Sequence, residues 1–303
     1  SLTPWTAAPA GAAAPPTADL PDMVVVQSES FFDVRRLHPD ISADVLRQFD
    51  ELGRSCTRRG RLHVPAWGAN TMRTEFAFLT GIGTAQLGVH RFNPYRHAAR
   101  SPVAALPAYL RSLGYRTVCI HPHRASFFQR HKVLPNLGFD EFIDITAFDG
   151  ATRTGPYVAD EAVTRKIAQV LAQPGGPVFV FAITMENHGP LHLERATAAD
   201  VEALYARPPP PGFDDLTIYL RHLANADRML GELADMLRTR TRDGLLCFFG
   251  DHVPSMPAVY EAMAFADPRT DYLIWRKGGG LGPDEDARVE QLGAMLVEIG
   301  NPR

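Results

Sequence analysis

Apolar residues along this chain form two kinds of pattern that alternate with each other. Four short runs of mostly Val, Ile, Leu and Phe lack polar alternation, which is typical of strands covered on both faces. These runs are residues 23–26, 117–120, 178–183 and 245–249. A fifth run, residues 272–275, is shorter and could form an edge strand.

Between these runs, apolar residues recur at spacings of three and four, which indicates helices with one buried face. The helical patterns cover residues 42–53, 71–80, 102–113, 158–172, 215–238 and 286–299. Strands that alternate with helices predict an α/β domain with a mainly parallel sheet. Residues 144–155 and 195–212 are expected to be surface loops, because they contain clusters of turn-forming residues.

Composition narrows the class of protein. A chain of 303 residues with 45% hydrophobic content can bury enough surface for one large domain. The net charge of -3 and the scattered basic residues do not form the basic stripe of a duplex-binding protein, so no nucleic-acid partner is expected. Three cysteines are too few for a disulfide framework. No apolar stretch reaches the roughly 18 residues that span a bilayer.

The first 20 residues differ in composition from the rest of the chain. Residues 1–20 are mostly Ala, Pro, Thr and Gly, which predicts a flexible linker ahead of a catalytic domain at 21–303. A linker that feeds directly into a core strand suits an ectodomain cut from a membrane anchor. We therefore expect a membrane anchor upstream of Ser1.

Chemically reactive side chains follow each of the four predicted inner strands, at the edge where open α/β sheets bind ligands. Glu29 follows the first run, and Asp251 and His252 follow the fourth. The second run is followed by His121-Pro122-His123-Arg124, and the third by Thr184-Met185-Glu186-Asn187-His188. An Asp-His pair alone is more often part of a turn than a metal site. Its occurrence together with the reactive residues that follow the other three strands favours a metal site.

Glu29, Asp251 and His252 form an oxygen-rich ligand set with one imidazole. Such a set suits Mn²⁺, Mg²⁺ or Zn²⁺ and leaves coordination positions open for a nucleophile and a substrate. The sequence therefore predicts a catalytic metal site.

A candidate nucleophile lies in the segment from Trp67 to Phe76, where a loop of small residues leads into a helical pattern. A hydroxyl at a helix amino terminus, such as that of Thr71, lies beside free N–H groups and the positive end of the helix dipole. Thr71 or Asn70 would serve equally as a helix cap, and this segment alone favours the cap.

Five motifs in order, QSESFF, WGANTMRTEF, HPHRASFFQR, MENHGP and FFGDH, resemble the lipoteichoic acid synthase family. The similarity runs from about residue 22 to residue 257. That family includes bacterial phosphoglycerol transferases and belongs to the alkaline phosphatase and sulfatase superfamily. The resemblance implies an alkaline phosphatase-like three-layer sandwich, with a central, mainly parallel sheet flanked by helices.

The resemblance also implies roles for individual residues. One divalent metal, most often Mn²⁺, would be bound by Glu29, Thr71, Asp251 and His252. Thr71 would be the nucleophile, and His121 or His188 would transfer protons. The expected substrate contacts are His121, His123, Phe128, Arg130 and His188, with Arg73 as an added positive charge that could instead pair with Glu75 or solvent.

Two of these positions depart from the family pattern. Phe128 stands where lipoteichoic acid synthases typically carry Trp, and His123 stands where an acid or amide is usual. Both departures concern head-group recognition. The chain after residue 257 is also shorter than the carboxyl-terminal part of those enzymes.

The function implied is transfer of glycerophosphate from a phospholipid such as phosphatidylglycerol to an envelope glycan or glycerophosphate acceptor, through a phospho-threonine intermediate. This chemistry would place the protein in the periplasm or on the extracellular face of the cytoplasmic membrane. Phosphoethanolamine transfer with zinc and phosphodiester hydrolysis remain alternatives, and a catalytically silent glycan- or lipid-binding module ranks below them. Sulfatase chemistry is disfavoured, because Ser255-Met256-Pro257 is followed by Val259 where an Arg is needed.

Overall fold

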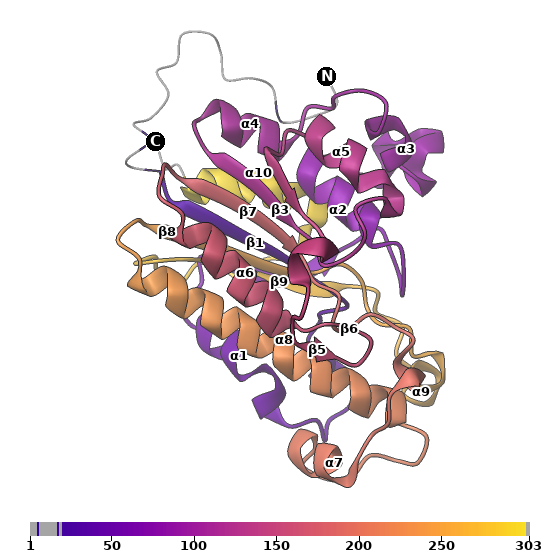
Figure 1. The fold of residues 1–303 in the computed structure, drawn as a ribbon. Coiled ribbons are helices and arrows are strands. Elements are labelled where there is room, and N and C mark those ends of the chain that lie inside the picture. Colours follow the sequence, from indigo (N-terminus) through magenta and orange to yellow (C-terminus); the bar gives the residue numbers. More distant parts are fainter. Residues whose placement is uncertain (1–4, 6–16, 18–19, 301–303) are drawn as a thin grey trace.

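The computed structural model describes residues 5, 17 and 20–300. An eight-stranded sheet forms its centre, in the order β10-β2-β9-β8-β1-β7-β3-β4 (Figure 1). Its strands are β1 (Asp22–Ser28), β2 (Arg58–His63), β3 (Arg116–Ile120), β4 (Glu141–Ile143), β7 (Val178–Ile183), β8 (Gly244–Gly250), β9 (Thr270–Arg276) and β10 (Ala287–Arg288). A two-stranded ribbon pairs β5 (Arg153–Thr154) with β6 (Tyr157–Val158).

The five strands from β8 to β4 are mutually parallel, as the four inner apolar runs predict. Their carboxyl ends therefore lie at one edge of the sheet, where the reactive tails begin. The expectation that residues 272–275 could form an edge strand is wrong, because β9 lies between β8 and β2 and pairs antiparallel with both. The sequence pattern missed β2, since its residues RRGRLH are polar and only partly buried.

Helices cover both faces of the sheet and complete three layers (Figure 1). They are α1 (Arg47–Gly53), α2 (Thr71–Thr80), α3 (Tyr95–Ala98), α4 (Leu106–Ser112), α5 (Arg130–Asn136), α6 (Asp160–Ala172), α7 (Ala198–Leu204), α8 (Asp214–Thr239), α9 (Pro257–Ala262) and α10 (Val289–Gly300). Val24 and Val26 of β1 face the layer of α1, α6 and α8, whereas Met23 and Val25 face the layer of α2, α4, α5 and α10. The period of two in a strand thus divides one apolar run between two cores.

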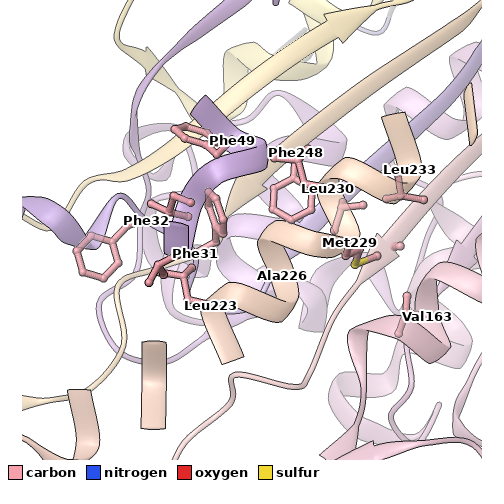
Figure 2. Packing of buried hydrophobic residues seen from close by; sticks show 14 of the residues in the cluster. Phe31, Phe32, Phe49, Val163, Leu223, Ala226, Met229, Leu230, Leu233 and Phe248 are labelled. Atoms are coloured by element: carbon pink, nitrogen blue, oxygen red, sulfur yellow. The ribbon is translucent and has the colours of Figure 1, made fainter. Parts of the chain in front are cut away.

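The long helix α8 supplies much of one core. Its residue Leu223 lies beside Phe31, and its residue Leu230 lies beside Phe248 of β8 (Figure 2). Phe31 contacts Phe248 edge-on, with ring centroids 5.0 Å apart. Each fully buried side chain of this size contributes about 1.5–3 kcal/mol to folding. This packing fixes the backbone immediately after β1, where Glu29 lies.

Two predicted loops contain short regular elements. Residues 144–155 include a 3-10 helix at Ile145–Phe148 as well as β5, and residues 195–212 include α7. Thr197 and Asp200 form a reciprocal capping box that begins α7. Of the predicted linker, only Trp5, Thr17 and Leu20 are described; the rest lies outside the described residues. Trp5 is buried beside Tyr109. Within the described residues, no helix is both long and apolar enough to cross a membrane.

Candidate metal centre and substrate cavity

The register of two neighbouring strands brings the predicted metal ligands together. Ser28 at the end of β1 is paired with Gly250 at the end of β8. Glu29 and Asp251 are the next residues on these two parallel strands, so their side chains leave the same edge of the sheet. Asp251 and Glu29 are almost fully buried, which is unusual for carboxylates and indicates a specific partner.

Glu29, Asp251 and His252 converge on one point. Their ligand atoms all lie within 4.8 Å of one another. The His252 Nε2 atom is 3.5 Å from Glu29 Oε1 and 3.4 Å from Asp251 Oδ2. Glu29 Oε2 and Asp251 Oδ2 are buried without a hydrogen-bond partner, and a bound cation would satisfy both. The donor set therefore fits a divalent metal.

Hydrogen bonds hold each ligand in a metal-binding orientation. The Nδ1–H of His252 donates to the Val253 carbonyl oxygen at 3.0 Å, which leaves Nε2 as the lone-pair nitrogen. The backbone N–H groups of Ser30 and His252 donate to Asp251 Oδ1, each at 2.9 Å. Ser30 Oγ donates to Glu29 Oε1 at 2.9 Å. These bonds leave His252 Nε2, Asp251 Oδ2 and Glu29 Oε2 without a hydrogen bond from the surrounding protein.

The electrostatics of the three groups also favour a cation. Burial, and then the Asp251 carboxylate, raise the pKa of Glu29 to about 7, although His252, His188 and Ser30 oppose the change. Burial disfavours the charged form of His252, but Asp251 and Glu29 outweigh it and raise the pKa of that imidazole. Because these two buried carboxylates favour the charged form of the neighbouring imidazole, they would favour a bound divalent cation in the same way.

Thr71 lies at the first position of α2, as the sequence predicts. The preceding Asn70 has left-handed backbone angles (φ 72°, ψ 43°) and makes no side-chain cap, so the capping interpretation fails for Asn70. The Oγ1 of Thr74, one turn into α2, donates to the Asp251 carbonyl oxygen at 2.8 Å. This bond ties the start of α2 to the ligand-bearing end of β8.

A cavity of about 370 Å³ lies beside these residues. Eight of the predicted site residues line it: Glu29, Thr71, His121, His123, Phe128, Arg130, His188 and His252. Asp251 is fully buried behind the cavity wall. Arg73 is not among the lining residues.

Arg130 forms a buried ion pair that the sequence did not reveal. Its Nη2 donates to Glu75 Oε2 at 2.8 Å, and both side chains are at most 1% exposed. Tyr95 Oη also donates to Glu75. Glu75 is therefore the partner of Arg130 rather than of Arg73. The Arg130 Nη1 atom is buried without a partner, which leaves one guanidinium donor available in the cavity wall.

Backbone carbonyls orient His121 and His188, two of the histidines that line the cavity. His121 Nδ1–H donates to the Ile183 carbonyl oxygen at 3.1 Å, so Nε2 carries the lone pair. Burial, and then the charge of Arg130, hold the pKa of His121 well below its usual value. His188 is exposed, and its Nδ1–H donates to the Gly189 carbonyl oxygen at 2.7 Å. Burial also lowers the pKa of His123, whose ring stacks on that of His121.

Asn187 and Tyr157 are two of the cavity-lining residues that the sequence interpretation did not select. Asn187 is 3% exposed, and neither its amide oxygen nor its amide nitrogen has a partner. The Tyr157 hydroxyl lies 3.1 Å from His188 Nδ1 and donates to the Gly189 carbonyl. Asn187 follows β7 and immediately precedes His188, so its position in the sequence could have indicated a cavity residue. Tyr157 lies in the hairpin of β5 and β6, where no sequence pattern indicated a functional residue.

Comparisons of the sequence give a family match over most of the chain. Residues 21–293 match the model of the sulfatase family. The capsular polysaccharide biosynthesis protein RkpI of Rhizobium meliloti is 35% identical over 259 residues, which are 84% of this chain and 45% of RkpI. The chain thus spans less than half the length of that relative.

Two solved structures share the fold. The phosphoglycerol transferase GacH of Streptococcus pyogenes, in complex with sn-glycerol-1-phosphate, aligns with a TM-score of 0.74 at 22% identity, covering 94% of this chain and 75% of GacH. The lipoteichoic acid synthase LtaP of Listeria monocytogenes aligns with a TM-score of 0.73 at 18% identity, covering 92% of this chain and 72% of LtaP. The fold expected from the resemblance is confirmed.

Proposed function

We propose, since this chain belongs to the sulfatase family, that it is a metal-dependent phosphoglycerol transferase within that family. It would move glycerophosphate from a phospholipid such as phosphatidylglycerol to an envelope glycan or glycerophosphate acceptor. One observation carries the proposal. Ligand atoms of Glu29, Asp251 and His252 lie within 4.8 Å of one another beside a cavity that Thr71 also lines.

The first step forms a phospho-threonine. Thr71 Oγ1 attacks the donor phosphorus, and the bond from phosphorus to the diacylglycerol oxygen breaks. The metal, when bound, supplies the positive charge that lowers the pKa of the attacking hydroxyl and offsets the charge of the phosphate oxygens. The free N–H groups at the start of α2 and the unpaired Nη1 of Arg130 are donors for those oxygens.

The second step releases the product. An acceptor hydroxyl attacks phosphorus, and the bond from phosphorus to Thr71 Oγ1 breaks. The proton of each attacking hydroxyl passes to an imidazole and returns to the leaving oxygen. His121 is placed to accept a proton, because its Nε2 carries the lone pair and its lowered pKa keeps the imidazole neutral. His188, which is exposed, is suited to exchange protons with an entering or departing hydroxyl.

The size and polarity of the site support the proposed donor, and a similar protein supports the proposed acceptor. A cavity of about 370 Å³ lined by histidines, one arginine and two asparagines suits a glycerophosphate head group. The similarity to a capsular polysaccharide biosynthesis protein supports a glycan acceptor. Both substrates belong to the cell envelope, so we place the activity on the outer face of the cytoplasmic membrane.

Mass spectrometry of the protein after incubation with phosphatidylglycerol and Mn²⁺ tests the proposal. We expect a glycerophosphate adduct on Thr71, together with release of diacylglycerol. A phosphoethanolamine adduct formed from phosphatidylethanolamine alone would instead support the alternative donor. Thr71→Ala should abolish the adduct, whereas Ser255→Ala, which removes another hydroxyl lining the same cavity, should retain it. Diacylglycerol release by Thr71→Ala at the wild-type rate would refute the covalent mechanism.

A further inference from the structure

One long segment of this acidic chain contains no acidic residue. Residues 76–139 include no Asp or Glu, but they include seven Arg and one Lys. The segment therefore has a net charge of +8, because it has eight cations and no acid, whereas the whole chain has a net charge of -3. A segment of this composition attracts polyanions when its cations remain unpaired.

Most cations of the segment have no acidic partner. Three of them pair with acids that lie outside it: Arg130 with Glu75, Arg111 with Asp140 and Arg116 with Glu141. Within the described part of the chain, no ion pair involves the other five, which are Arg91, Arg96, Arg100, Arg124 and Lys132. All five are exposed.

Exposed apolar side chains accompany these cations. The 3-10 helix at Gly88–Phe92 presents Val89 and Phe92, which are 84% and 68% exposed. The guanidinium of Arg91 lies 4.9 Å from the centroid of the Phe92 ring. Arg96 and Arg100 follow on and after α3. We call the surface formed by Val89, Arg91, Phe92, Arg96 and Arg100 the basic face.

The basic face adjoins the wall of the catalytic cavity. The Nδ2 of Asn136 at the end of α5 donates to the carbonyl oxygen of Ala98 in α3 at 2.8 Å. The same α5 begins at Arg130, which lines the cavity. Figure 1 shows α3 beside α2 and α5 at the outer side of that layer. A surface that held the basic face would therefore hold the cavity close to it.

We propose that the basic face binds the surface of an anionic phospholipid bilayer. The biological reason for this binding rests on the proposed function, since the donor is a phospholipid. Arginines would lie at the level of the phosphate groups, and Val89 and Phe92 would enter the boundary between head groups and acyl chains. A dissolved polyanion would give Val89 and Phe92 no apolar partner, so the bilayer explains both features of the face.

Vesicle co-sedimentation of the metal-free chain tests the proposal without requiring turnover. We expect the chain to bind vesicles that contain phosphatidylglycerol and not vesicles of phosphatidylcholine alone. Arg96→Ser with Arg100→Ser should lower the vesicle partition coefficient by about fivefold for each arginine removed. Val89→Ser with Phe92→Ser should lower it as well, because the apolar contact is lost.

Matched variants elsewhere control for charge and apolarity. Arg47→Ser with Arg54→Ser removes two exposed arginines at α1, in the opposite helical layer. Leu281→Ser removes an apolar side chain that is 65% exposed. The neighbouring Gly282 contacts Thr57, which immediately precedes β2. This position lies at the end of the sheet opposite the cavity. Neither control should change vesicle binding. If the controls weaken binding as much as the basic-face variants, the proposal is overturned.

Two further results separate this proposal from others. Equal loss of binding to vesicles and to soluble heparin in the arginine variant, with no effect of Val89→Ser and Phe92→Ser, would indicate a polyanion site and overturn the bilayer proposal. Turnover of a short-chain, water-soluble phosphatidylglycerol should be unchanged in the basic-face variants. If that turnover is absent from the wild type while vesicle binding follows the predicted pattern, the proposed function fails and the docking surface stands.

Discussion

Replacing Glu29 by Gln should change the stability of this protein in opposite directions with and without metal. In the metal-free protein, burial and Asp251 raise the pKa of Glu29 from 4.5 to about 7. A folded-state pKa above the unfolded value favours folding below pH 4.5, and this contribution is lost as the pH rises through 7. At pH 8 the ionised Glu29 therefore costs the folded state up to about 3 kcal/mol.

The amide introduced by Glu29→Gln would carry no charge at any pH, so this cost disappears. The metal-free Glu29→Gln variant should be more stable than the wild type at pH 8, by up to about 3 kcal/mol. At pH 4 the two should be nearly equal, because Glu29 is then protonated in both the folded and the unfolded protein. Ser30 Oγ can still donate to the oxygen of the new amide, so that hydrogen bond is retained.

Metal should reverse the order of stability. A ligand at a thousand times its dissociation constant stabilises the folded state by about 4.1 kcal/mol, which exceeds the cost of about 3 kcal/mol that the ionised Glu29 imposes. The wild type should gain this stability from Mn²⁺ at pH 8, whereas Glu29→Gln, which lacks one anionic ligand, should gain much less. Urea unfolding in EDTA and in Mn²⁺ measures both effects, with Glu202→Gln as a control on an exposed carboxylate. Equal stabilisation of Glu29→Gln and the wild type by Mn²⁺ would show that Glu29 is not a ligand.

Three other substitutions test the site in separate ways. Glu75→Gln should lower the free energy of unfolding by about 3–5 kcal/mol, because Arg130 then carries a buried charge without its counter-ion. Urea unfolding measures this change, and a loss under about 1 kcal/mol would contradict the buried ion pair. Asn187→Ala should reduce kcat/KM by about tenfold to a hundredfold without changing the fold, if its unpaired amide contacts substrate; unchanged kinetics would refute that contact. Thr74→Val should weaken Mn²⁺ binding in calorimetry, because the Asp251 backbone loses its bond to α2; unaltered affinity would show that this bond does not position the ligand.

The parts of the fold that were predictable are those whose pattern is local. The helix predicted at residues 71–80 is α2, because its apolar spacing and its start both lie within one short segment. The helix predicted at 215–238 differs from α8 by one residue at each end. In contrast, the polar segment Arg58–His63 becomes a strand only because β9 offers it hydrogen bonds. The strand β9 lies more than 200 residues further along the chain, and no periodic pattern in the sequence indicates this pairing.

The candidate site likewise contains residues that the sequence could identify and contacts that it could not. Glu29, Asp251 and His252 were identifiable because each directly follows an apolar strand, and parallel strands place such residues at one edge. The pair between Glu75 and Arg130 was not identifiable, since the two residues are 55 positions apart and each has other plausible partners. The pairing leaves Arg130 only one free donor atom in the cavity wall.

The sequence by itself determined the order of the apolar strands, the helices predicted between them, and the chemical groups that follow each of those strands. These properties depend on the spacing of residues along the chain, which the sequence states directly. The tertiary structure alone decided which polar atoms remain without a partner: Glu29 Oε2, Asp251 Oδ2, Arg130 Nη1 and both amide atoms of Asn187. Whether a buried polar atom is satisfied depends on every segment packed around it, so only the folded chain defines the atoms available to metal and substrate.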